Sequence, residues 1–157
     1  MERSDRYHYI ESGLDNVYLV NGFEFVDTPR GQGVTIRNRE GLHRAIGLWL
    51  VRDKRNLTGR EFRFLRNELN LTQRNLAELL GVSDQAIARW EKGRTKEPID
   101  GPAQRMIRLM YSEVINKNES IMGPLRRLAE LDELTHEDED LEFEDSDEGW
   151  QPALLAA

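Results

Sequence analysis

The sequence contains no cysteine. This absence excludes a disulfide framework and any zinc site built on cysteine ligands. The sequence also lacks an apolar run long enough to cross a lipid bilayer, and its N-terminus lacks the charged and then apolar pattern of a signal peptide. We therefore expect a cytoplasmic protein that makes no contact with a membrane.

Side chains that could build an active site are also scarce. The three histidines, His8, His43 and His136, lie far apart, and neither metal-ligand spacing nor a Ser/His/Asp pattern connects them. The short glycine pair at residues 31–33, GQG, is too small for a phosphate-binding loop and indicates a turn. We therefore expect no catalytic residues, no bound metal, no cofactor and no enzymatic activity.

Charge is distributed unevenly along the 157 residues, whose formal net charge is -7. Residues 1–53 are nearly neutral, with 7 Lys and Arg against 8 Asp and Glu. Residues 54–111 carry 12 basic against 7 acidic side chains, whereas residues 112–157 carry 3 against 14. The central block therefore has the positive charge that contact with nucleic-acid phosphates requires, and the acidity lies mostly at the C-terminal end.

Residues 73–92 within the basic block, QRNLAELLGVSDQAIARWEK, fit a helix-turn-helix. Leu76 and Leu80 lie on one face of a predicted first helix, and Ala77 is small where the two helices must cross. Gly81 falls at the turn, where a left-handed backbone is least costly for glycine. The pattern predicts two short helices that meet at a fixed angle.

The second helix of this motif is predicted to begin after Ser83 as its N-cap, with Ile87 and Trp90 turned to the core. In a DNA-binding helix-turn-helix the opposite, N-terminal face of this helix enters the major groove. The residues predicted on that face are Ser83, Asp84, Gln85, Ala86 and Arg89. The alternative is a helical hairpin with only a structural role, because any amphipathic helix pair shares part of this spacing.

Several of these side chains have natural base partners. Gln85 can form two hydrogen bonds with the N6 and N7 of adenine, and Arg89 can donate two hydrogen bonds to the O6 and N7 of guanine. Ala86 is small enough to admit a thymine methyl group. Asp84 can accept from the N4 of cytosine, orient Arg89 or cap the helix, and the sequence leaves these three roles open.

The longer run LRNELNLTQRNLAELLGVSDQAIARWEKGRTKEP resembles the DNA-binding domain of Xre and Cro/CI repressors, over about residues 57–111. The resemblance implies that Gln73 contacts a phosphate, that Arg66 forms an ion pair with Glu91, and that residues 93–96 contact phosphates of the DNA backbone. The residues expected to contact phosphates are Gln73, Arg74, Asn75, Lys92, Arg94, Thr95 and Lys96.

A looser resemblance links residues 17–91 to the YgiT/MqsA-type antitoxins. The run at residues 57–66, LTGREFRFLR, matches the segment that precedes the helix-turn-helix in those proteins. The paired CxxC zinc ligands of that family are absent, and residues 27–33 stand about where the second pair would lie. Zinc binding is therefore not expected, although an antitoxin role stays open.

The N-terminal fifty residues are predicted to form a small β region with one helix. Asn21-Gly22 separates two β-prone runs within residues 17–26 and predicts a hairpin, with a third strand at residues 34–36. A helix capped by Asn38 is predicted over residues 39–52. Its apolar stripe would consist of Leu42, Ala45, Ile46, Trp49 and Leu50.

Before the motif, Thr58 and Glu61 have the spacing of a capping box at a helix start. After the motif, helices are predicted over residues 102–116 and 124–134. Residues 137–148 are almost wholly acidic, a composition typical of disorder. Such a tail is a solvated segment, a protein-binding segment or a mimic of DNA that competes for the basic face.

We therefore predict a mainly α chain with three parts: a small β-hairpin-plus-helix region at 1–53, a lambda-repressor-like five-helix DNA-binding domain at 54–134, and an acidic, disordered tail at 135–157. The expected function is a transcriptional regulator, specifically a repressor that binds a palindrome in double-stranded DNA as a homodimer. The alternative is an antitoxin that neutralises a protein toxin and regulates its own promoter. A protein partner would bind the N-terminal region or the acidic tail.

Overall fold

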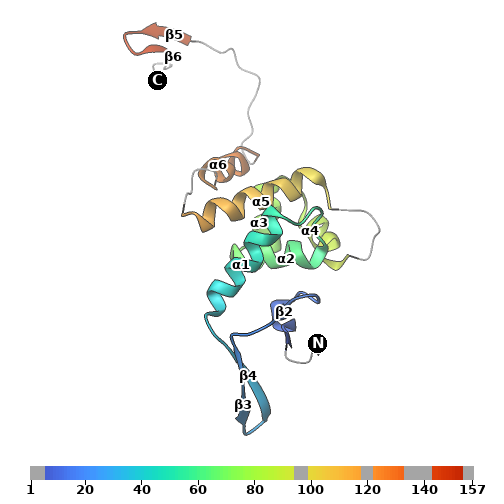
Figure 1. The fold of residues 1–157 in the computed structure, drawn as a ribbon. Coiled ribbons are helices and arrows are strands. Elements are labelled where there is room, and N and C mark those ends of the chain that lie inside the picture. Colours follow the sequence, from blue (N-terminus) through green and yellow to red (C-terminus); the bar gives the residue numbers. More distant parts are fainter. Residues whose placement is uncertain (1–5, 94–98, 118–121, 133–142, 154–157) are drawn as a thin grey trace.

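The computed structural model describes residues 6–93, 99–117, 122–132 and 143–153 (Figure 1). These parts contain six α-helices and one 3-10 turn. The helices are α1 (Arg39–Arg52), α2 (Gly59–Glu68), α3 (Gln73–Leu80), α4 (Asp84–Lys92), α5 (Gly101–Ile115) and α6 (Met122–Asp132), and the turn is η1 (Ile10–Ser12). None of the helices in these parts is long and apolar enough to cross a membrane.

The strands of the described parts form three separate antiparallel pairs. These pairs are β1 (Tyr7–His8) with β2 (Tyr18–Leu19), β3 (Phe23–Thr28) with β4 (Gly31–Ile36), and β5 (Phe143–Ser146) with β6 (Gly149–Pro152). In Figure 1 the β3–β4 hairpin extends away from the helices. The chain is therefore mainly helical with small strand pairs, as its sequence predicted, whereas the five-helix lambda-repressor-like arrangement stays a prediction.

The predicted hairpin at Asn21-Gly22 is wrong in its pairing. Gly22 does adopt a left-handed backbone, with φ of +79°. However, β2 pairs with β1, and β3 pairs with β4. The turn between β3 and β4 lies at Thr28 and Gly31, where the Thr28 hydroxyl donates a hydrogen bond to the Gly31 carbonyl. The local signal located a turn correctly, but the choice of strand partner depended on the N-terminal residues that lie beside β2.

Helix α1 has the bounds that the sequence predicted, and the Asn38 side chain accepts a hydrogen bond of 3.2 Å from the Gly41 amide as its cap. Its buried face differs from the predicted stripe. Gly47 and Leu50 are buried, whereas Trp49 is 53% exposed. The reason is the position of α5, which packs on α1 with Tyr111 directly over Gly47.

Helix α2 begins with the predicted capping box. The Thr58 hydroxyl accepts from the Glu61 amide at 3.2 Å, and the Glu61 carboxylate accepts from the Thr58 amide at 2.8 Å. These two bonds satisfy backbone donors that would otherwise lack partners at a helix start. The cap therefore fixes where α2 begins, and with it the position of the buried face that carries Phe62 and Leu65.

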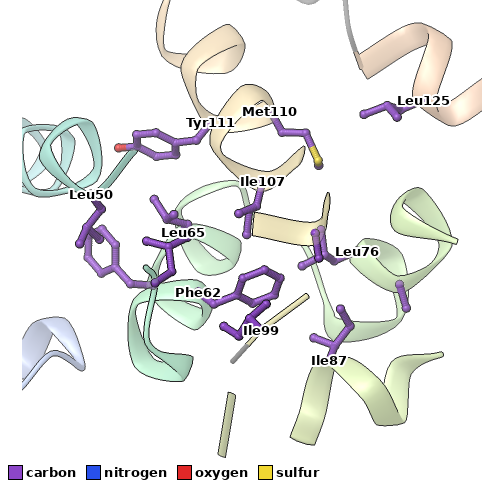
Figure 2. Packing of buried hydrophobic residues seen from close by; sticks show 14 of the residues in the cluster. Leu50, Phe62, Leu65, Leu76, Ile87, Ile99, Ile107, Met110, Tyr111 and Leu125 are labelled. Carbon is purple, nitrogen blue, oxygen red and sulfur yellow. The ribbon is translucent and has the colours of Figure 1, made fainter. Parts of the chain in front are cut away.

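One hydrophobic core joins the N-terminal region to the helices that follow it. Phe62, Leu76, Ile87 and Ile107 are fully buried at its centre (Figure 2). The same cluster includes a residue from the N-terminal loop and one from α1, namely Leu14 and Leu50. The described part of the N-terminal region, residues 6–53, therefore shares its core with helices α2 to α6.

The segment between α1 and α2 is held by side chains of α5. Arg108 donates hydrogen bonds of 2.7 Å to the Leu50 carbonyl and 3.2 Å to the Arg55 carbonyl. Gln104, which is buried, accepts from the Leu57 amide at 3.0 Å. The segment at residues 53–57 is thus fixed to α5 over part of its length.

The predicted disordered tail includes a segment with regular structure. Within residues 135–157 the structure describes residues 143–153, which form the β5–β6 hairpin with Phe143 opposite Pro152. The remainder of the acidic run lies outside the described residues. Both hairpin aromatics, Phe143 and Trp150, are exposed.

Candidate nucleic-acid interface

The helices α3 and α4 form the predicted helix-turn-helix, and side chains close both of their N-terminal ends. The Thr72 hydroxyl accepts from the Asn75 amide at 3.0 Å, and the Ser83 hydroxyl accepts from the Ala86 amide at 3.1 Å. Between the helices, Gly81 has a φ of +69° and ends α3. Because each boundary is fixed by its own cap, the angle between the two helices is set locally.

The inner face of the motif is buried as predicted. Leu76 and Ile87 have no exposed surface, and Ala77 is almost completely covered. The Trp90 ring meets the Phe62 ring edge to face, with 5.9 Å between ring centroids. These contacts seat α4 on α2 and α3, so its outer face has one orientation relative to the core.

The outer face of α4 carries four of the five predicted base-contacting residues. Ser83, Asp84, Gln85 and Arg89 are exposed. Ala86 is only 8% exposed, so little of its side chain is open to a thymine methyl group, and this contact stays a prediction. Position 86 lies one turn before Trp90 and beside Ile87, and these positions share the face that turns inward.

Asp84 had three predicted roles, and the geometry narrows them. The cap of α4 is supplied by Ser83, and among the described residues Asp84 makes no ion pair with Arg89. Its carboxylate lies in the first turn of α4, where the positive end of the helix dipole stabilises a negative charge. Ser83 therefore takes the capping role, while contact with the N4 of cytosine and orientation of Arg89 on DNA both stay predictions for Asp84.

Arg66 and Glu91 form the ion pair that the sequence predicted. The guanidinium donates two parallel hydrogen bonds of 2.8 Å to the two carboxylate oxygens, and both residues are buried. A third donation from Arg66, of 2.9 Å, reaches the Leu71 carbonyl. One side chain of α2 therefore holds both the end of the recognition helix and the link that leads into α3.

The predicted phosphate contacts differ in their present partners. The side-chain amide of Gln73 donates a hydrogen bond of 3.4 Å to the Glu91 carboxylate. Arg74 forms an ion pair of 3.5 Å with Glu78 of its own helix. Asn75 is exposed on α3, and Lys92 is exposed in the last turn of α4. Three further predicted contacts, Arg94, Thr95 and Lys96, lie outside the described residues.

Two arginines of α2 that the sequence did not single out lie close to this surface. Arg63 is 66% exposed, with its Nε atom 3.9 Å from a carboxylate oxygen of Glu91, and Arg60 is exposed one turn earlier. A signal was present in the sequence, because residues 60, 63 and 66 repeat arginine at the spacing of one helix face.

A second polar cluster connects the N-terminal region to α1 and α2. His43 lies between the Tyr9 hydroxyl, 2.7 Å from its Nε2 atom, and the Glu68 carboxylate, 2.8 Å from its Nδ1 atom. Tyr9 is 1% exposed, and this burial raises the pKa of its hydroxyl. The three groups form a chain of hydrogen bonds that connects the N-terminal region to α1 and α2.

Comparison with known families places the same segment in a recognised class. Residues 62–98 match the family model described as Helix-turn-helix, which is of the Xre and Cro/CI type. The match begins inside α2 and ends in the segment after α4, so it spans the ion pair and the recognition helix. Comparisons with curated proteins and with solved structures found no match. The domain indicates a DNA-binding transcription regulator.

Proposed function

We propose that this protein is a sequence-specific repressor of transcription that binds a palindromic operator in double-stranded DNA as a homodimer. The main support for this proposal is the outer face of α4, where polar side chains that can hydrogen-bond to bases are exposed. Buried contacts fix the position of this helix. A single domain of this size reads only a few base pairs, and a twofold dimer doubles that contact. Repression would follow from steric occlusion of a promoter.

The proposal includes a cytoplasmic location and no catalytic activity. Its central experiment is selection of bound sequences from a random duplex library with the full-length protein. A twofold-symmetric consensus that contains an A·T pair next to a G·C pair in each half-site is the expected result. A pool that stays random, with binding equal for all sequences, would contradict sequence-specific regulation.

Dimer formation is tested separately. We expect analytical ultracentrifugation with the selected duplex to give two protein chains per palindrome and one chain per isolated half-site. One chain on the full palindrome would contradict the homodimer while leaving sequence-specific binding intact.

We propose as a second candidate that the protein is an antitoxin whose N-terminal region neutralises a protein toxin. It is supported by residues 57–66, which resemble the corresponding antitoxin segment and here form the capped start of α2. The discriminating experiment looks for a small gene adjacent to this one and expresses it with and without this chain. Growth arrest that this chain relieves favours the antitoxin, and its absence favours the plain regulator.

A further inference from the structure

A polar cleft lies beside the end of the recognition helix, outside the helix-turn-helix itself. Its volume is about 550 Å³, and it is walled by η1, by α2 and by the last turn of α4. Its walls include three cationic side chains, Arg60, Arg63 and Lys92. Because Lys92 belongs to the predicted phosphate contacts, the cleft is continuous with the DNA-binding surface.

The cleft has an excess of positive charge that is open to solvent. Of its two carboxylates, Glu91 is already neutralised by the two hydrogen bonds from Arg66. The other, Glu11, accepts a hydrogen bond from the Tyr7 hydroxyl, which leaves its charge in place. Among the described residues Arg60 has neither an ion pair nor a hydrogen bond, and Arg63 approaches Glu91 no closer than 3.9 Å.

The position of the two arginines follows from close packing of α2 on α4. A Cβ atom added at Gly59 would collide with the Trp90 carbonyl, so the first turn of α2 lies directly against the last turn of α4. Arg60 follows Gly59, and Arg63 lies one turn further along the same helix. Both arginines therefore belong to the part of α2 near the last turn of α4, and both line the cleft together with Lys92.

We propose that this cleft binds the phosphodiester backbone of DNA, so that the DNA-binding surface extends along α2 to the N-terminal region. Arg60 and Arg63 are the phosphate ligands, and the turn that contains Glu11 forms the far wall. Guanidinium groups suit this role because their fixed fork of donors matches the oxygens of a phosphate. The inference rests on the proposed function, since it adds a contact to a protein that binds DNA.

The test uses the full-length double variant Arg60→Gln/Arg63→Gln. Its affinity is measured at several salt concentrations for the selected operator and for a random duplex. We expect weaker binding to both duplexes by the same factor, and a slope of log affinity against log salt that is smaller by about two. A matched control, Arg44→Gln/Arg52→Gln, removes the same charge from exposed positions on α1, which packs on α2 and α5. We expect its slope to equal that of the wild type.

A second variant tests the far wall of the cleft without removing a cation. Glu11→Gln should bind both duplexes more tightly at low salt, because it removes a negative charge that repels the phosphates. Glu24→Gln, which changes an exposed carboxylate on β3, should leave the affinity unchanged. If Glu11→Gln and Glu24→Gln had equal DNA affinities at low salt, DNA would not lie beside the N-terminal turn that contains Glu11.

Three results separate the possible outcomes. If the arginine variants and their α1 control have equal slopes, the cleft does not hold DNA, although the proposed function stands. If wild-type protein binds neither duplex, the proposed function and this inference both fail. If the arginine variants and their α1 control have equal slopes, while inorganic phosphate, compared with chloride at equal ionic strength, raises the melting temperature of the wild type but not of Arg60→Gln/Arg63→Gln, the cleft is a site for free phosphate and the inference is overturned.

Discussion

The Tyr111 hydroxyl lies against Gly47, so closely that a Cβ atom at position 47 would overlap it. This approach joins α5 to α1 and leaves space for no residue larger than glycine. We predict that Gly47→Ala lowers the free energy of unfolding by about 1–3 kcal/mol through overpacking, measured by chemical denaturation. In a Tyr111→Ala background the same change should instead raise stability by up to about 1 kcal/mol, because alanine is the better helix former once the clash is gone. An equal loss in both backgrounds would contradict the clash.

Burial of the same tyrosine has a consequence for the pH dependence of stability. It raises the pKa of Tyr111 from 10.0 to about 12. An unfolded chain therefore loses this proton at a lower pH than the folded protein, so the hydroxyl contributes stability below pH 10 that is lost as the pH rises towards 12. We predict that ultraviolet titration detects one tyrosine ionising near pH 12 and that Tyr111→Phe removes this component. An unchanged titration curve would contradict the assignment.

The ion pair between α2 and α4 yields a prediction about stability. Removing one partner leaves the other charged and buried, which is strongly unfavourable. We predict that Glu91→Ala lowers the free energy of unfolding by about 3 kcal/mol, whereas Arg63→Ala, at an exposed arginine near the same carboxylate, costs less than about 1 kcal/mol. A double-mutant cycle between Arg66 and Glu91 measures the coupling. A coupling energy near zero would exclude a stabilising pair.

Base recognition by α4 can be separated from phosphate contact by substitution. We predict that Gln85→Ala and Arg89→Ala each weaken operator binding by about 1–3 kcal/mol and relax sequence preference at one position, measured by repeating the library selection. Binding to random DNA should change little for Gln85→Ala. Ala88→Ser, at a position of α4 outside the predicted base contacts, serves as a control and should leave the selected motif unchanged. If neither Gln85→Ala nor Arg89→Ala altered the motif, this face would not read bases.

The acidic tail should oppose DNA binding through its charge. Residues 135–157 contain nine acidic side chains and no Lys or Arg, and Phe143 and Trp150 of the β5–β6 hairpin are exposed. We predict that truncation after Leu134 leaves the melting temperature unchanged and raises DNA affinity at low salt, with the effect fading as salt screens the charges. A full-length variant with the nine acids changed to Asn and Gln should reproduce the gain. Equal affinities at low salt would show that the tail does not shield the basic face.

Several features of the fold were predictable because they depend on residues close together in sequence. The caps at Asn38, Thr58 and Ser83 each form within three residues of the helix that they start. The left-handed turn at Gly81 needs only the absence of a side chain. Pairing of Arg66 with Glu91 spans 25 positions, and here the resemblance to a known domain supplied what local rules could not.

Other features required the folded arrangement. No local rule shows that β2 pairs with residues 7–8 and not with β3, because both strands have suitable residues. The exposure of Trp49 and the burial of Ala86 depend on where neighbouring helices cross α1 and α4. Likewise, the repeat of arginine at residues 60, 63 and 66 is visible in the sequence, but the cleft that Arg60 and Arg63 share with η1 depends on the folded arrangement.

Leu14 and Leu50 lie in the same core as the recognition helix, and this shared core links binding at one end of the protein to folding at the other. If the N-terminal region and the helix-turn-helix unfold as one cooperative unit, a molecule that binds only the folded N-terminal region raises the folded population of both. Such a molecule then increases the concentration of protein whose recognition helix is folded and able to bind DNA, although the molecule itself does not contact DNA. The two ends are coupled most strongly when the protein is close to its melting temperature.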